Sequence, residues 1–244
     1  MPGRVAGPVG PASRATTGED ERVTALRLVS WNVRSLRDDS AGVAAALRAL
    51  GADVVLVQEA PRLVLSGPAN GRLGRRAGLR RVVGGAPAAG NLLLVSRRVE
   101  VVDAHAVRLP KRPRLHRRGA VLAVLAVDGH RFGVLGTHLD LDPAARLDTA
   151  ERLRAALPRV PPLIVGADLN EESGSPAWQV LSAELIDVCH GLGPTFPQRE
   201  PRRRIDAVFA DPAFAVERAE RPDPGPVTDH LPLVVDLLLS PQPR

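Results

Sequence analysis

The sequence contains no tyrosine, and its aromatic side chains are limited to four Phe and two Trp in 244 residues. Hydrophobic residues nevertheless make up 44% of the chain. A folded core must therefore be built from Val, Leu, Ala and Ile, whose branched side chains have to supply the packing. Because single-stranded nucleic acid usually stacks its bases on aromatic side chains, this scarcity also argues against an aromatic binding platform.

Cysteine is almost as scarce. A single residue, Cys189, excludes an intramolecular disulfide and any cluster of thiolates for zinc or iron and sulfur. Long apolar runs are missing as well, because no stretch approaches the roughly 18 to 20 residues that a membrane helix needs. We therefore expect a cytoplasmic, monomeric protein with no membrane-spanning segment.

The domain organisation follows from length and composition. The first 22 residues lack the apolar run of a secretory signal. We predict that residues 1–22 form a disordered tail, either native or the result of a start assigned too early, and that residues 23–240 form one domain. No serine lies in a nucleophile-elbow pattern, which argues against a serine hydrolase.

Positive charge is concentrated in the middle of the chain. Residues 60–127 contain 13 Arg and one Lys against two acids, so this segment carries +12 and the remainder −6 of the net +6. A basic region attracts phosphate-bearing partners. The alternative is compositional, since Lys111 is the only lysine and the chain is rich in arginine throughout. Both interpretations stay open on the sequence.

The hydrophobic pattern predicts more strands than helices. Residues 38–51 and 142–157 have the charge preference, caps and stop residues of helices, with Asp142 as a cap and Pro143 in the first turn. Strands often follow one another directly, which favours mixed sheets with flanking helices over an alternating parallel fold. Loops at 60–90 and 109–118 are the candidates for substrate contact. Strands are predicted at 25–32, 53–59, 91–96, 119–127, 131–139, 162–170, 204–210 and 231–239.

Polar side chains recur where these apolar runs end. In an open α/β sheet, the strand ends are where side chains converge on a ligand. Four such endings, together with an acid in the strand at 204–210 and an acid–histidine pair before the last strand, indicate one site. The residues are Asn32, Gln58 and Glu59, Thr137 and His138, Asp168 and Asn170, then Asp206, Asp229 and His230.

Six motifs in a fixed order make the pattern specific. They are WN at 31–32, QE at 58–59, TH at 137–138, GADLN at 166–170, RID at 204–206 and TDHLP at 228–232. In this order they resemble the endonuclease/exonuclease/phosphatase superfamily of magnesium-dependent phosphoesterases, which includes DNase I-like and abasic-site nucleases. The resemblance implies an α/β (α+β) fold, a four-layer α/β/β/α sandwich of two mixed sheets packed face to face with flanking helices.

The resemblance also implies a metal site. Mg²⁺ prefers oxygen ligands and keeps several waters, so one or two protein carboxylates are enough to hold it. Glu59 is then the main ligand, with Asn32 beside it and Asp229 as a further contributor. Mn²⁺ is the alternative ion.

The same resemblance implies five catalytic residues. Asp168 orients or deprotonates the attacking water, and Asn170 positions the water or a phosphate oxygen. His230 contacts the scissile phosphate while Asp206 holds its imidazole, and His138 is a second phosphate contact or an acid.

Substrate contacts and one departure complete the comparison with the family. Arg118 is predicted to bind substrate, as are Arg112 and Arg114 in the basic stretch KRPRLHRRG. Arg34 stands where many nuclease members carry an acid, which puts a second metal ion in doubt. The lack of tyrosine excludes the active-site tyrosine of abasic-site nucleases, and His138 resembles the DNase I-like alternative.

The resulting hypothesis is a Mg²⁺-dependent phosphoesterase whose partner is a phosphate ester. The substrate is left open between nucleic acid, cut by an endonuclease or exonuclease, and a lipid or small-molecule ester, cut by a phosphatase or phosphodiesterase. A non-catalytic phosphate-binding module is the alternative from another class.

Overall fold

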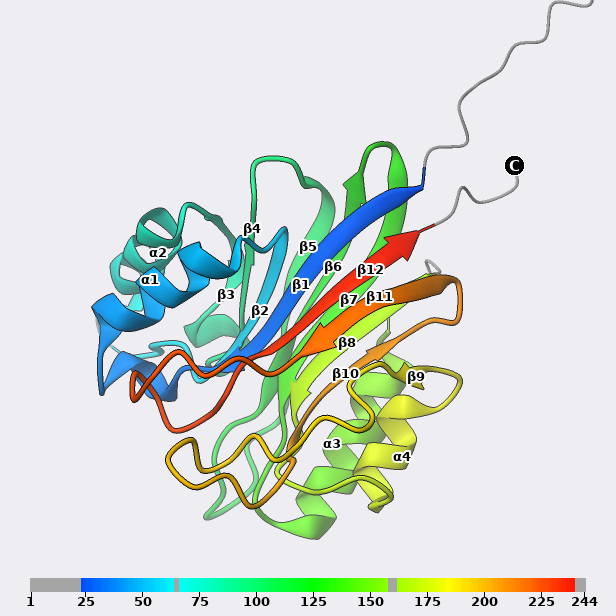
Figure 1. Cartoon of the computed structure of the whole chain (residues 1–244). Helices are drawn as coiled ribbons and strands as arrows, with labels where there is room; N and C mark the ends of the chain where they lie inside the picture. The colour runs from blue at the N-terminus through cyan, green and yellow to red at the C-terminus, as the bar shows by residue number, and fades with distance from the viewer. Residues whose placement is uncertain (1–22, 64–65, 158–161, 240–244) are drawn as a thin grey trace, which may run out of the picture.

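Two six-stranded sheets pack face to face, and a pair of helices covers the outer face of each sheet (Figure 1). This computed structural model describes residues 23–63, 66–157 and 162–239. The arrangement confirms the predicted four-layer sandwich of mixed sheets. The predicted tail at 1–22 lies outside the described residues, so the tail and the domain boundaries stay predictions.

The first sheet has the strand order β11-β12-β1-β2-β4-β3. Only β1 and β2 run parallel, and the other neighbours are antiparallel. Helices α1 and α2 lie on its outer face (Figure 1). The elements are β1 (Thr24–Asn32), α1 (Ser40–Leu50), β2 (Val54–Gln58), α2 (Ser66–Ala77), β3 (Arg80–Gly84), β4 (Leu92–Val95), β11 (Phe214–Glu220) and β12 (Leu233–Leu239), with 3-10 turns at Arg34–Leu36 and Ala86–Ala88.

The second sheet repeats this plan with the order β5-β6-β7-β8-β10-β9. Its one parallel pair is β7 and β8. Helices α3 and α4 cover its outer face. The elements are β5 (Glu100–Arg108), β6 (Gly119–Val127), β7 (His130–His138), α3 (Pro143–Ala155), β8 (Leu163–Asp168), α4 (Pro176–Ser182), β9 (Ile186–Asp187) and β10 (Asp206–Ala210).

Aliphatic side chains fill the space between the sheets, as the shortage of aromatics requires. Leu56, Val121 and Val134 are fully buried in this layer. Two glycines allow the sheets to approach closely: a Cβ on Gly166 would lie 2.7 Å from a methyl carbon of Leu56, and one on Gly136 would lie 3.0 Å from its other methyl carbon. Leu56 of one parallel pair therefore packs directly against the backbone of the other.

The local signals predicted from sequence are present. The side chain of Asp39 caps α1 and Gly51 ends it in the left-handed conformation. Asp142 caps α3, and its side chain accepts a hydrogen bond from the backbone amide of Ala145. The turn between β6 and β7 consists of Asp128 and Gly129, both with positive φ, as a two-residue hairpin requires.

The prediction of a loop over 60–90 is wrong, because α2 and β3 lie within it. Helix α2 has three glycines and a proline in twelve residues, so its intrinsic propensity is poor. Burial of Leu73 and Ala77 against the first sheet stabilises it instead. The predicted loop at 109–118 is present, while α4 and the peripheral strands β5, β9 and β11 were not predicted. In the described part of the chain, no helix is long and apolar enough to cross a membrane.

Candidate active site

The candidate site lies where the two parallel strand pairs end. Asn32 is the last residue of β1, and Glu59 follows the last residue of β2. In the other sheet, His138 ends β7 and Asp168 ends β8, and these two residues are register partners. Parallel neighbours place their carboxyl ends at the same edge of a sheet, so packing two such pairs face to face brings four polar ends together.

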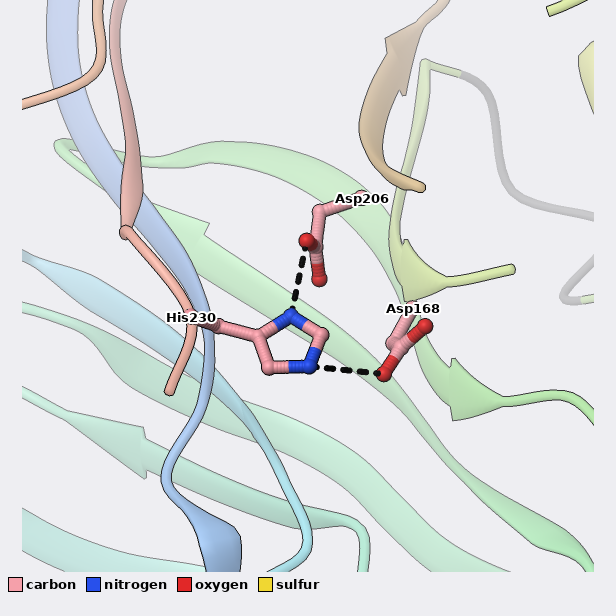
Figure 2. Close-up of side chains that lie close together, drawn as sticks. All are labelled: Asp168, Asp206 and His230. Carbon is pink, nitrogen blue, oxygen red and sulfur yellow. Dashed lines mark hydrogen bonds and ion pairs between the residues drawn. The ribbon is translucent and has the colours of Figure 1, made fainter. Parts of the chain in front are cut away.

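His230 lies between two buried carboxylates at this edge (Figure 2). Its Nδ1 is 2.9 Å from Oδ2 of Asp206, and its Nε2 is 3.8 Å from Oδ2 of Asp168. The two aspartates are themselves partners across β8 and β10. The indole of Trp31 donates to the backbone oxygen of His230 at 2.8 Å, and the ring of Phe196 lies 4.8 Å from the imidazole. The imidazole is thus fixed from its backbone, its face and both nitrogens.

The charge state of His230 follows from these neighbours. Burial alone would favour the neutral ring, but the negative charges of Asp206 and Asp168, with the hydrogen bond to Asp206, outweigh it and raise the pKa of His230 to about 10. His230 is therefore an imidazolium at neutral pH.

His138 has the opposite character although it also faces Asp168. Its Nε2 is 3.4 Å from Oδ2 of Asp168 and 2.9 Å from Nδ2 of Asn170. Burial dominates here, and with the nearby charge of Arg118 it lowers the pKa of His138 to about 3 in spite of Asp168. The two histidines therefore differ by one charge at neutral pH.

Asn32 connects the two sheets at the site. Its amide nitrogen donates to Asp168 at 2.8 Å and to Glu59 at 3.2 Å. Its oxygen accepts from the backbone amide of Arg34 at 2.9 Å. One amide thus fixes the separation of two carboxylates from different sheets.

Two of these residues have a strained backbone. Glu59 has φ of 51° and Asn170 has φ of 53°, a left-handed conformation that is costly for a non-glycine residue. Glu59 directly follows β2 and Asn170 lies two residues after the end of β8, where the chain turns sharply. The amide nitrogen of Asn170 donates to the backbone oxygen of Leu139 at 3.0 Å, which holds this turn against the end of β7.

The site opens into a cleft of about 680 Å³. Glu59, His138, Asp168, Asn170 and His230 all line it. Arg118 is the only one of the three predicted substrate arginines that does. Arg112 lines a neighbouring hollow, where it pairs with Asp148 at 2.8 Å, and Arg114 lines neither space.

Comparison with known proteins identifies the family of this chain. Residues 29–230 match the model of the Endonuclease/Exonuclease/phosphatase family. The chain belongs to this family. A search of curated proteins finds no significant match.

Solved structures of family proteins share the fold. The endonuclease/exonuclease/phosphatase from Bacteroides vulgatus aligns with a TM-score of 0.75 at 21% identity over 88% of this chain and 99% of its own. TDP2 from D. rerio in complex with single-strand DNA product aligns at 0.72 and 17% identity, over 88% and 99%. A mannosyl-6-phosphatase from Bacteroides thetaiotaomicron aligns at 0.70 and 17% identity, over 87% and 99%.

One candidate ligand of this family member already has a cationic partner. Oδ2 of Asp229 lies 3.2 Å from Nε of Arg34, whose guanidinium also reaches Asp38 at 3.1 Å. Arg34 occupies the position where an acid was expected, and Asp229 and Asp38 together raise its pKa. Asp229 lines both the cleft and a second hollow that contains Arg34.

Glu59 is the residue that best fits a metal ion. Among the described residues, no arginine or lysine nitrogen lies within 4 Å of its carboxylate, and the one histidine that does, His138 at 3.8 Å, is neutral. The carboxylate is 37% exposed on the cleft and offers the hard oxygen that a divalent ion prefers. Asp168, Asp206 and His230 also have ligand atoms within 4.8 Å of one another, but the charged His230 lies between those carboxylates, where its positive charge opposes the binding of a cation.

The structure adds site residues that the motifs do not include. Asp140 pairs with Arg118 at 3.2 Å, and both side chains are largely buried beside the cleft. Its position two residues after His138, at the end of a predicted strand, was the available clue. Phe196, Arg203 and Arg62 also line the cleft. Arg62 lies in the segment 60–90 that was predicted to contact substrate, and Arg203 directly precedes the RID motif, so position along the chain was the available clue for these two.

Proposed function

We propose that the protein hydrolyses phosphate esters with a bound divalent ion, Mg²⁺ or Mn²⁺. The observation that carries the proposal is the imidazolium of His230, held between Asp168 and Asp206 on a cleft that also contains the uncompensated carboxylate of Glu59. In this arrangement the cationic His230 can bind the anionic phosphate of a substrate, and the anionic Glu59 can bind the metal ion. The family membership and the neighbours named above, a phosphatase and a protein bound to a DNA product, support the same class of reaction.

Each residue of the site has a separate role in the proposed reaction. Asp168 accepts the proton of the water that attacks phosphorus, since its carboxylate lines the cleft beside His230. His230 faces the phosphoryl oxygens with a positive charge and stabilises the negative charge that grows there as the ester P–O bond breaks. Asp206 acts through His230 by keeping it charged and oriented.

His138 and Asn170 then hold the substrate without transferring a proton to it. A histidine with a pKa of about 3 is a neutral ring at neutral pH, so it is not an acid for the departing oxygen, and its one ring N–H suits a phosphate contact. Asn170 reaches His138 at 2.9 Å and orients its ring. The departing oxygen takes its proton from solvent at the open mouth of the cleft.

The metal ion, when bound, supplies Lewis-acid stabilisation of the phosphoryl and departing oxygens. Glu59 is the residue that we propose to hold it. Asn32 supports Glu59 through the 3.2 Å hydrogen bond, and its role as a direct ligand stays a prediction. Asp229 would contribute only if it left Arg34.

The substrate is anionic in either of the two open classes. Arg37, Arg62, Arg118 and Arg203 line the cleft and add positive charge around the site. The predicted contacts of Arg112 and Arg114 would require a substrate that extends beyond the cleft, as a nucleic acid would. We propose that residues 23–240 form the catalytic domain, since the family model covers residues 29–230 of this range, and that this domain works as a monomer.

The test is a panel of DNA, RNA, phospholipid and small phosphate esters assayed with Mg²⁺, with Mn²⁺ and with excess chelator. We expect turnover of at least one class with metal, and loss of that turnover in chelator and in Glu59→Gln. Glu184→Gln is the matched control, because Glu184 is highly exposed and pairs with Arg154 on α3. Phosphate binding without turnover of any ester would instead support the non-catalytic binding module.

A further inference from the structure

The two most exposed large hydrophobic side chains of the described residues both lie on the cleft. Leu63 is 82% exposed and Leu141 is 69% exposed, whereas the next, Val23, is 54% exposed and precedes β1 at the end of that strand away from the site. Both leucines line the same cleft as the catalytic residues. Leu63 follows Glu59 by four residues and Leu141 follows His138 by three, so each belongs to a loop that leaves a parallel strand at the site.

The exposure of Leu141 is not the result of a loose loop. Its backbone amide donates to Oδ1 of Asp140 at 2.8 Å, and its backbone oxygen accepts from Nη1 of Arg146 at 2.9 Å. Arg146 is in turn paired with the buried Glu171 at 2.9 Å. The backbone is therefore held while the side chain points to solvent.

The segment that carries Leu63 is also anchored. The side chain of Asn70 on α2 donates to the backbone oxygen of Pro61 at 3.0 Å. The backbone oxygen of Leu63 itself accepts from the amide of Ser66 at 3.0 Å. Two anchored loops thus present aliphatic side chains to water, and burying these side chains against an apolar ligand would be favourable.

The remaining walls of the cleft give the partner an amphiphilic character. Arginines and the catalytic groups suit a phosphate, while Pro61 and Ala89 are apolar lining residues that lie beside the buried Ala60 and Ile205. Phe196 is the one Phe, Trp or Tyr among the lining residues, and it packs on His230. A nucleobase usually stacks on a free aromatic face, whereas an aliphatic chain packs on leucine.

We propose that Leu63 and Leu141 bind the aliphatic part of the substrate, which is a phosphate diester of an aliphatic alcohol. This inference rests on the proposed phosphoesterase function and names its substrate class. The phosphate lies among the charged groups of the cleft, and the alkyl chain leaves between the two leucines. The leucines determine specificity and take no part in bond breaking.

The test uses alkyl 4-nitrophenyl phosphates from methyl to hexyl, kept below the concentrations at which they form micelles. Water attacks phosphorus, the bond to nitrophenolate breaks, and the alkyl phosphate remains, so one chromophore reports every ester. We expect kcat/KM of the unaltered enzyme to rise about two- to fourfold per added methylene, the value for burying a CH₂ group. The rise should be reduced to less than about 1.5-fold per methylene in Leu63→Ser with Leu141→Ser.

Matched controls come from other exposed hydrophobic residues. Ile186 on β9 and Val216 on β11 are 49% and 43% exposed, and neither lines the cleft. Ile186→Ser with Val216→Ser should keep the full dependence on chain length. The dependence is the readout, so a general loss of rate or stability in a variant does not imitate the effect.

Three outcomes would overturn the inference. They are a flat dependence in the unaltered enzyme, an equal dependence in the leucine and control variants, and a preference for dinucleotides over all alkyl esters. The first with normal turnover leaves the proposed function standing. Absence of turnover for every ester would contradict the proposed function, and calorimetric binding of methyl to hexyl phosphate then tests the leucines by the same dependence on chain length.

Discussion

The two ends of the central strands carry charged clusters that are built on opposite principles. At the end away from the site, Arg27 on β1 pairs with Asp236 on β12 through two contacts of 2.6 and 2.8 Å. Arg98 pairs there with Asp53 at 3.2 Å and with Asp128 at 2.8 Å. In this cluster every carboxylate has an arginine.

At the site, carboxylates are surrounded by amides and histidines instead. Asp168 accepts from Asn32 and contacts His138 and His230, while Glu59 faces an amide and a neutral histidine. An arginine that pairs with a carboxylate stays charged and compensates the carboxylate charge. Amides and histidines compensate it less completely, so part of the negative charge stays available to a ligand. The comparison teaches that the same residue types stabilise the fold at one end and remain available for chemistry at the other.

The largest effects should come from the charged pair at the site. We expect Asp168→Asn and His230→Ala each to lower kcat by at least about a hundredfold, the order associated with a positioned base or an electrostatic stabiliser. The free energy of unfolding should fall as well in His230→Ala, because this change removes the buried ion pairs with Asp168 and Asp206. Steady-state kinetics and denaturant unfolding of the same preparations measure both quantities.

Combining variants tests whether Asp206 acts through His230. Asp206→Asn alone should also be slow, because an amide does not stabilise the imidazolium. Adding it to His230→Ala should cost little more than His230→Ala alone, since residues that act as a unit are not additive. Losses that multiply would show that the two residues act independently.

The pH dependence of stability should show the contrast between the two histidines in metal-free protein. The folded pKa of His230 is about 10, above its ordinary 6.5, so its contribution is complete below pH 6.5 and is lost as pH rises through about 10. This loss amounts to at most about 1.4 kcal/mol per pH unit. The folded pKa of His138 is about 3, so its contribution is complete above pH 6.5 and is lost as pH falls toward 3.

Separate variants should remove the alkaline and the acidic decrease of the unfolding free energy with pH. His230→Ala should flatten the alkaline limb and His138→Gln the acidic limb of the unfolding free energy, measured in excess chelator. If both limbs survive both variants, the charge states assigned to these histidines are wrong.

The ion pair of Arg34 with Asp229 makes part of the site resemble the arginine–carboxylate cluster at the other end of the strands. Removing Arg34 should therefore increase the difference between the two ends. In Arg34→Ala, Asp229 loses its cationic partner, so we expect Mn²⁺ to bind about three- to tenfold more tightly by calorimetry. Arg37→Ala is the control, because Arg37 also lines the cleft but forms no ion pair within the described residues. Equal effects of the two variants would mean that Arg34 acts only through general charge.

The smallest effects should come from variants of the arginine–carboxylate cluster at the end of the strands away from the site. Asp236→Asn should lower the free energy of unfolding by about 1 kcal/mol, because the bidentate contact to Arg27 is partly exposed. Asp128→Asn, whose side chain is 56% exposed, should cost less than about 0.5 kcal/mol. Turnover should be unchanged in both variants, and a catalytic defect in either would contradict the separation of the two clusters.

The sequence predicted the central strands and the site better than the periphery. Strands β1, β2, β7 and β8 are long apolar runs that end in polar residues, so periodicity and motif point to the same positions. Helix α2 and strand β5 escaped prediction because glycines, arginines and an exposed edge hide the pattern, and tertiary packing decides their structure. The contacts of Arg34 and Asp140 join segments through folding, which motifs do not encode.

Binding of Mn²⁺ to the unaltered protein and to Glu59→Gln tests the central claim most directly, because it reports the uncompensated carboxylate without relying on turnover. By calorimetry and electron paramagnetic resonance, we predict one ion per chain in the unaltered protein and at least a tenfold loss of affinity in Glu59→Gln, with Glu184→Gln unchanged. Equal affinity in all three proteins, or no binding to the unaltered one, would contradict the account.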